Sequence, residues 1–372
     1  MHCSFSRRRL LHSVVPALSA GQLSMSAQAS SKADAGKLAM PGPFPGRVVE
    51  VHHPGAIVSG KYQAEPVKQM MQKGMTELTG GNWTEAWRLF AQPGDVVGIK
   101  LNPVGMPNII SAPEVLHQII NGLNAAGVPN KDIVVYDRYH DQFVKAGFPE
   151  WLPAGVRWTS AAKDFELVQQ SIEGYDPDHY MDMAVTLPGY DATNVTARRS
   201  YAARFITRDV NKLINLCILK DHGAAGVTLA LKNMSHGLVN NVNRTHSTKG
   251  INVCGAFIPS VVSMPTIRNK AVLHILDGIQ GQYQGGPGPR PQFIWEHKTM
   301  YFATDPVALD HAGLRVIDAK RISVGLKPIA EAEPDQYITR RIRQPEHIEI
   351  AGAMGLGVWE WDKIDLRKIS LA

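Results

Sequence analysis

Positively charged and titratable side chains gather in one short stretch, LKDHGAAGVTLALKNMSHG, which spans residues 219–237. Lys220 and His222 end an apolar run and come directly before a turn of small residues, Gly223–Gly226. Backbone amides in such a turn can approach a ligand closely, and the N-terminus of the helix that follows favours anions. This stretch therefore predicts a binding turn for a carboxylate or a phosphate.

The helix expected over residues 227–236 adds a second set of polar side chains. Thr228, Lys232 and His236 are spaced four apart, so they share one helix face. If that face turns back toward the preceding strand, Lys232 meets Lys220, and crowding together with burial lowers the pKa of a lysine. A lysine with a lowered pKa can act as a base. The candidate catalytic residues are therefore Lys220, His222 and Lys232.

Other side chains are placed to hold an anion. Lys100 and Asn102 lie at the end of the apolar run of residues 95–101. We predict as substrate-binding residues Lys100, Asn102, Asn233 and His236. Taken singly, each has a simpler interpretation, since a lone histidine is more often a hydrogen-bonded loop residue and a lone lysine often lies on a solvated helix face.

Three aspartates form a separate candidate set for a metal. Asp277 follows an apolar run directly, and Asp305 and Asp310 lie in the segment ATDPVALD. Carboxylates bind hard cations such as Mg²⁺ or Ca²⁺, and a histidine among them shifts the preference toward iron, manganese or zinc. Asp305 has a second interpretation as the N-cap of a helix that begins at Pro306. The predicted metal ligands are Asp277, Asp305 and Asp310.

The elements that must position these residues alternate along the chain. Apolar β-rich runs alternating with helical spacing predict an α/β fold, with a mostly parallel sheet and helices on both faces. Ligands of such sheets bind outside the carboxyl ends of the strands, where the polar side chains stand. Strands are expected at residues 47–51, 95–101, 132–136, 212–219, 271–276, 300–303 and 364–369. Helices are expected at residues 66–78, 112–126, 227–236, 306–320 and 344–354. No element is assigned over residues 147–200, and the Gly- and Pro-rich residues 281–289 are interpreted as a loop over the site.

The N-terminal residues resemble a twin-arginine export signal. Three arginines, Arg7–Arg9, precede two leucines, a weakly apolar run and a small-x-small segment, Ala27–Ala29. We expect a periplasmic or otherwise exported protein that meets the twin-arginine export machinery; a disordered basic tail is the alternative. The predicted organisation is a signal peptide at residues 1–29, a linker at 30–46 and a single α/β domain at 47–372.

Composition argues against several classes of protein. Residues 1–29 hold three of the 39 basic residues and no acid, so the net charge without them is 36 − 33 = +3. No basic block points to nucleic acid, and no run of about 18 apolar residues predicts a membrane helix in the mature chain. Cys217 and Cys254 are too few for an iron–sulfur cluster, which needs about four ligands. Whether these two cysteines form a disulfide stays open.

Five segments of the chain together, by their content and their order, resemble a known family. They are GIKLN at residues 98–102, LKDHGAAGVTLALKNMSHG at 219–237, LDGIQG with the later GPGP at 276–289, ATDPVALD at 303–310 and EHIEIAGAMGLG at 346–357. Together they resemble the bacterial and archaeal domain-of-unknown-function family 362. The resemblance implies that the lysine–histidine turn and the aspartate segments belong to a shared site, and it implies no particular reaction. Some members are described as iron–sulfur proteins with ferredoxin-like cysteine motifs, whereas this chain has no CxxC pair.

Three functions fit these observations. The first is an exported enzyme that acts on a small anionic molecule, a carboxylate or a phosphate, with a divalent metal as its one suggested cofactor; hydrolysis, isomerisation and elimination all stay open. The second is a non-catalytic periplasmic protein that binds a ligand or a cofactor, or assists a redox partner. The third is a purely structural exported domain, which is disfavoured because clustered charge is costly unless it is paired or used.

Overall fold

The computed structural model of the chain describes residues 36–246, 248, 250–339 and 342–372. The predicted signal peptide and residues 30–35 of the predicted linker lie outside the described residues. The remainder of that linker packs on the domain, because Met40 is buried and its amide donates to the carbonyl of Arg268 at 3.0 Å. The folded part of the chain thus begins before residue 47.

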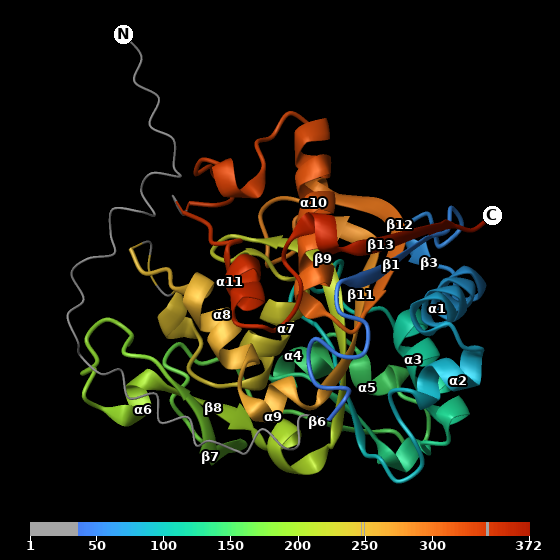
Figure 1. The fold of residues 1–372 in the computed structure, drawn as a ribbon. Coiled ribbons are helices and arrows are strands. Elements are labelled where there is room, and N and C mark those ends of the chain that lie inside the picture. Colours follow the sequence, from blue (N-terminus) through green and yellow to red (C-terminus); the bar gives the residue numbers. More distant parts are fainter. Residues whose placement is uncertain (1–35, 247, 249, 340–341) are drawn as a thin grey trace. The chain divides into compact units, whose positions relative to one another are not determined.

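A nine-stranded sheet lies at the centre of this described part (Figure 1). Its strands are β1 (Arg47–His52), β4 (Val97–Lys100), β5 (Ile133–Tyr136), β6 (Arg157–Thr159), β9 (Lys212–His222), β10 (Gly226–Val227), β11 (Ala271–Gln282), β12 (Ile294–Ala303) and β13 (Asp365–Ser370). The order is β13-β1-β12-β11-β9-β4-β5-β6, and β10 pairs with β9. Neighbours run parallel from β11 to β6 and between β1 and β13, whereas β12 is antiparallel to both of its neighbours.

Helices cover both faces of the sheet, so the predicted fold class is confirmed. One core contains side chains of α1 (Ala64–Thr79), α2 (Trp83–Arg88), α3 (Pro113–Ala126), α4 (His140–Lys145) and α5 (Phe148–Trp151). The other core contains side chains of α7 (Leu229–Leu238), α8 (Cys254–Val262), α9 (Pro265–Arg268), α10 (Pro306–Ser323) and α11 (His347–Ala353). In the described residues, no helix combines the length and the apolar character that crossing a membrane requires.

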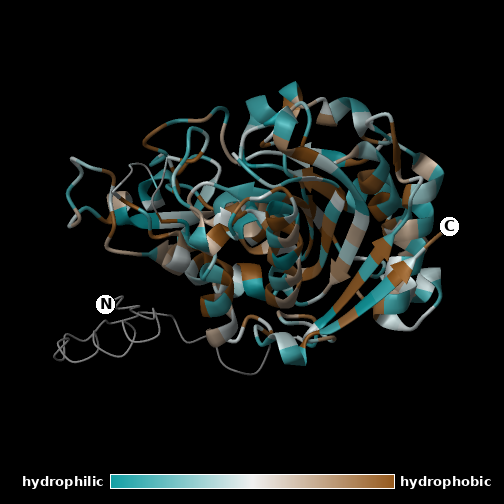
Figure 2. Cartoon of the chain, turned by 90° about the horizontal axis from the view of Figure 1, so that it is seen from above, coloured by the Kyte–Doolittle hydropathy of each residue, from teal (hydrophilic) through white to brown (hydrophobic). Residues whose placement is uncertain are grey.

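The alternation of side chains along β9 explains why its residues 213–219 are apolar apart from Asn215. Leu213 and Cys217 face one core, and Ile214 and Leu216 face the other. A central parallel strand is buried on both sides, so both sets of positions must be apolar. Figure 2 shows hydrophobic residues concentrated in the strands and hydrophilic ones on the outer helices and loops.

Two small antiparallel pairs lie outside the main sheet. They are β2 (Ile57–Val58) with β3 (Lys61–Tyr62), and β7 (Tyr175–Asp182) with β8 (Arg199–Ala203), which follows α6 (Val195–Arg198). Residues 147–200, to which the sequence assigns no element, therefore contain α5, β6, β7, α6 and the start of β8. The strand β7 reads YDPDHYMD and has no apolar run, because it is half exposed and is held by its pairing with β8.

Two central strands extend beyond their predicted ends. β9 continues through Lys220 to His222 because β10 folds back and pairs with it, Val227 opposite Asp221. β11 continues to Gln282 because β12 supplies an antiparallel partner along this polar stretch. Asp277 therefore lies inside a strand and not after one, and the Gly- and Pro-rich loop begins only after Gln282.

Candidate functional site

A cavity of about 270 Å³ lies where the carboxyl ends of β4, β5 and β9 meet α7. All the predicted catalytic and substrate-binding residues lie in its wall: Lys100, Asn102, Lys220, His222, Lys232, Asn233 and His236. Among the described residues that line it, the charged ones other than histidines are Lys100, Asp137, Arg138, Lys220 and Lys232. Four cationic groups thus face one carboxylate, and the cavity carries a surplus of positive charge.

Lys100 is the most firmly held of these cations. It ends β4, is buried, and forms an ion pair with Asp137, which follows β5. The backbone of α7 passes directly over its side chain, because a Cβ at Gly237 would come within 2.1 Å of the Cε of Lys100. Glycine at this position therefore leaves space for the lysine side chain. Because Asp137 forms its ion pair with Lys100, none of the described residues in the cavity wall offers a second carboxylate to the other cations.

Lys220 lies on β9 with its ammonium group directed to the loop after β4. The Nζ atom donates to the Oδ1 atom of Asn102 at 2.8 Å and also contacts the carbonyl of Val104. The pKa of Lys220 is lowered to about 7, first by burial and then by the charges of Lys232 and Lys100, whereas Asp221 and Asp137 act in the opposite direction. At neutral pH this lysine is divided between its charged and uncharged forms.

Lys232 approaches the cavity from α7. Its pKa is lowered to about 8, first by burial; Cys254 acts in the opposite direction, and the charges of Lys100 and Arg138 lower the pKa as burial does. Thr228 and His236 lie in the same wall, so the predicted common face of this helix is confirmed. Burial lowers the pKa of His236 well below its usual value, with the charge of Lys232 as the next cause.

A chain of amide side chains connects the lysines. Asn102 donates to the Oδ1 atom of Asn233 at 3.0 Å, and Asn233 donates to the Oδ1 atom of Asn215 at 2.7 Å. Asn215 in turn donates to the carbonyl of Ala230 at 3.1 Å. Because each amide both donates and accepts, the Oδ1 atom of Asn102 is held toward Lys220.

His222 and the turn after it do not have the ligand-binding role that the sequence predicts, because they bind each other. The Nδ1 atom of His222 accepts from the amides of Ala224 and Ala225, both at 3.1 Å, and the amide of Gly223 donates to the carbonyl of Gly286 at 3.1 Å. The expectation that these amides bind a ligand is therefore wrong, since they already have partners inside the protein. With Nδ1 as the acceptor, the neutral ring carries its proton on Nε2.

Asp277 lies inside β11, in the interior of the sheet, and accepts hydrogen bonds from two neighbouring groups. Its carboxylate accepts from the hydroxyl of Tyr62 at 3.1 Å and from the amide of Ile279 at 3.1 Å. Burial raises the pKa of Asp277 to about 7. It is not among the residues of the cavity wall.

Asp305 and Asp310 both bind backbone amides at helix starts. Asp305 is the N-cap of α10, as the alternative interpretation predicted, and accepts from Val307 and Ala308. Asp310 accepts from Ala230 at 2.7 Å and Leu231 at 2.9 Å, so it caps α7 from a different helix. The amides at the start of α7, which were expected to attract an anionic ligand, are thus occupied by this carboxylate.

The structure does not bring the three predicted metal ligands together as a set. In the part of the chain that is described, the one group of three or more histidine, cysteine or acidic side chains with converging ligand atoms consists of His236, His246 and Cys254. The contacts of Asp277, Asp305 and Asp310 are those of structural acceptors. Cys217 and Cys254 are both buried and are not joined by a disulfide.

Comparison with known protein families confirms the family resemblance that the five sequence segments indicate. The sequence profile of the family described as "Domain of unknown function (DUF362)" matches residues 97–315, which is more than half of the chain. The chain belongs to the DUF362 family. No curated protein matches it.

The DUF362 match contains every predicted site residue, since the first is Lys100 and the last is Asp310. Two strands of the sheet lie outside the match, β1 and β13, and they pair with each other in parallel. The cavity that contains Lys100, Lys220 and Lys232, called the lysine cavity below, is therefore lined entirely by residues within the DUF362 match. One edge of the sheet is completed by segments that flank the match.

Several residues in or directly behind the cavity wall were missed or left without a role. Arg138 is buried and donates to Tyr175, Gln169 and the carbonyl of His236, so it ties β5 to α7. A wider hollow of about 910 Å³ lies beside the cavity, shares Arg138, Tyr139 and Gln169 with it and is lined by residues of β6 and β7. Asn215 could have been noticed, because it is the one polar residue inside the run LINLCIL.

Proposed function

We propose that this DUF362 protein is an exported enzyme that binds a small carboxylate or phosphate in the lysine cavity and transfers a proton to or from it. The observation that carries the proposal is the charge of the cavity wall, four cationic groups against one carboxylate in a space of about 270 Å³. Cations withdrawn from water repel one another, and an anionic ligand relieves that repulsion.

Lys220 is the proposed base. It lies in the cavity wall, and its pKa of about 7 makes the uncharged amine abundant at neutral pH. A pKa near the working pH is what general base catalysis requires. Lys232 and the protonated form of Lys220 would hold the anion, and the uncharged form of Lys220 would accept the proton, a step with which isomerisations and eliminations of carboxylates begin.

The lowered pKa of Lys220 favours an enzyme over a binding protein. A binding site for an anion gains affinity from a lysine that stays fully charged, and it loses affinity when the lysine is half deprotonated at neutral pH. Export rests on the arginine signal at residues 1–29, and it is tested by recovering the protein from the periplasm of a host with twin-arginine export.

The affinity for a dicarboxylate is expected to depend on pH. Malonate is a suitable probe because its charge hardly changes from pH 6.5 upward. Lys220 loses its charge near pH 7 and Lys232 near pH 8, so malonate binding should weaken by about 10-fold or more between pH 6.5 and pH 9. The charged groups that act on Lys220 are Lys232 of α7, Lys100 of β4, Asp137 after β5 and Asp221 of β9.

Titration calorimetry in buffers of different ionisation enthalpy measures both the affinity and the protons taken up. Uptake of protons on binding near pH 8 is expected, because the anion raises the pKa of Lys220. An exposed lysine offers a matched control: Lys131→Met should leave the profile unchanged. A pH-independent affinity with no proton uptake would contradict the assignment of Lys220.

A further inference from the structure

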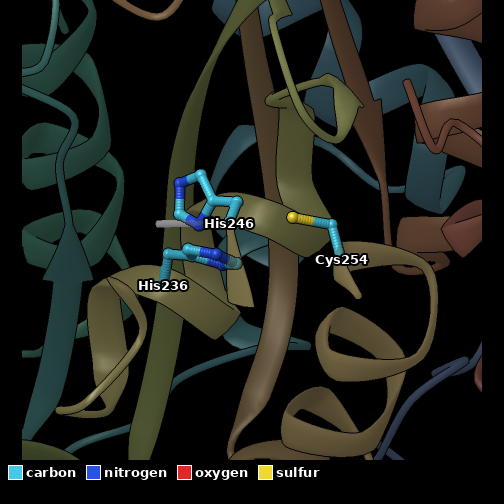
Figure 3. A group of neighbouring side chains, drawn as sticks. All are labelled: His236, His246 and Cys254. Atoms are coloured by element: carbon cyan, nitrogen blue, oxygen red, sulfur yellow. The ribbon is translucent and has the colours of Figure 1, made fainter. Parts of the chain in front are cut away.

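Three potential metal ligands converge beside the lysine cavity from three separate segments. His236 comes from α7, His246 follows the turn of residues 243–245, and Cys254 begins α8. Their ligand atoms all lie within 4.8 Å of one another. Figure 3 shows the two imidazole rings one above the other, with the sulfur of Cys254 turned toward them from the first turn of its helix.

Neighbouring hydroxyl groups hold these side chains in position. The Thr245 Oγ1 atom donates to the carbonyl of Val242 at 2.7 Å and lies 2.9 Å from His246 Nδ1, 3.5 Å from His236 Nε2 and 4.0 Å from Cys254 Sγ. On the other side of its ring, His236 Nδ1 lies 3.0 Å from the Oγ atom of Ser235. Hydrogen bonds of this kind from neighbouring residues orient the ligands of metal sites.

The chemistry of the group selects a class of metal. A thiolate and two imidazoles suit zinc and its neighbours among the transition metals, whereas Mg²⁺ and Ca²⁺ prefer oxygen ligands. Zinc bonds of about 2.0–2.3 Å in a tetrahedron require ligand atoms about 3.3–3.8 Å apart. Side-chain rotations that move the ligand atoms by about 1 Å are therefore enough to close the group around an ion.

The position of the group indicates what such an ion would do. His236 and His246 lie in the cavity wall together with Lys220 and Lys232. Three protein ligands with a fourth position open to a substrate are typical of catalytic zinc, and structural zinc has four protein ligands. A metal here would polarise an oxygen of the anion that the lysines bind.

We propose that His236, His246 and Cys254 form a mononuclear site for a divalent transition metal of the zinc class, with its open coordination position directed into the lysine cavity. The chemical role of the metal rests on the proposed function, since it needs an anion in that cavity. Binding of the metal itself does not, and it is measured in the absence of any anion.

Cobalt(II) is the probe that tests the site. The full chain, freed of metal with a chelator, should bind one Co²⁺ per chain and develop the thiolate-to-cobalt charge-transfer band and the d–d bands of a tetrahedral complex, all abolished by Zn²⁺. Cys254→Ser should lose the charge-transfer band, and His246→Gln and His236→Gln should each weaken Co²⁺ binding by about 100-fold or more. Circular dichroism checks that each variant is folded.

Cys217→Ser is the matched control, because Cys217 is equally buried but lies on β9 with its thiol against the carbonyl of Ile275. It should leave the cobalt spectrum unchanged. A wild-type chain that binds no Co²⁺, or a charge-transfer band that survives in folded Cys254→Ser, overturns the site. Malonate titration of the metal-free chain tests the anion site alone, and the cobalt titration tests the metal site alone. The two experiments therefore distinguish a failure of the anion site from a failure of the metal site.

Discussion

Replacement of Lys220 by methionine is expected to weaken the binding of malonate at pH 6.5 by about 10- to 100-fold, the value of one charge-assisted hydrogen bond to a buried anion. At this pH Lys220 is mostly protonated, because its pKa is about 7. Methionine fills a similar volume without the charge. Calorimetric titration of the wild type and the variant under matched conditions measures the difference.

The same substitution should leave the protein as stable as the wild type or make it more stable. In the ligand-free protein, burial and the neighbouring lysines both act against the charged form of Lys220, so the charge costs stability. A residue that costs folding free energy and is placed in a cavity is typical of a functional site. Thermal unfolding of Lys220→Met therefore checks that weaker binding is not caused by unfolding.

Two further variants make this prediction sharper. Lys220→Arg keeps the positive charge at every pH, so it should retain malonate binding at pH 6.5 and lose the part of the pH dependence that Lys220 contributes. The part that comes from Lys232, whose pKa is about 8, should remain. Lys131→Met removes an exposed lysine and should bind malonate as the wild type does. If folded Lys220→Met bound malonate with wild-type affinity, Lys220 would have no part in anion recognition.

Replacement of Asp305 by alanine is expected to lower the free energy of unfolding by about 3–5 kcal/mol. Each buried amide left without an acceptor costs about 1–3 kcal/mol, and removal of the buried carboxylate relieves its own desolvation cost, which offsets part of this loss. The carboxylate accepts from four amides, those of Gly46 and Val358 at 2.9 and 2.8 Å and those of Val307 and Ala308 at 2.9 Å each. It therefore joins three segments that are far apart in sequence. Chemical denaturation measures the loss.

The control for Asp305 is an exposed aspartate. Asp362→Ala should change the free energy of unfolding by about 0.5 kcal/mol or less, as surface substitutions usually do. If Asp305→Ala instead kept its stability and lost a bound divalent ion, the metal-ligand prediction for this residue would stand and its structural role would fall.

The positions of the cavity lysines could be predicted from sequence because the rules that place them are local. Lys100 and Lys220 each end an apolar run, and parallel strands bring their carboxyl ends to one edge of the sheet. Lys232 follows from helix spacing within the same short segment. Strand and helix periodicity together were enough to bring these residues to one cavity.

The roles of the aspartates could not be predicted in the same way. Thr228, the residue before α7, makes no capping hydrogen bond with its side chain, and the cap is supplied by Asp310, about 80 residues later in the chain. Likewise, the position of Asp277 inside a strand depends on the pairing of β11 with β12. Both features are tertiary, and neither leaves a pattern in the neighbouring sequence.

His246 was overlooked for a related reason. It lies in a polar segment without helical or strand periodicity, and only the fold brings it to His236 and Cys254. A set of ligands with no regular spacing in the sequence is recognised from the distances between atoms, whereas motifs with fixed spacing are recognised from sequence.

The most direct measurement is a crystal structure of the protein grown with malonate at pH 6.5. The central claim, that the lysine cavity binds a small anion, predicts malonate in the cavity with its carboxylate oxygens about 2.7–3.2 Å from the Nζ atoms of Lys220 and Lys232. Malonate bound only elsewhere on the protein, with water alone between these two lysines, would contradict it.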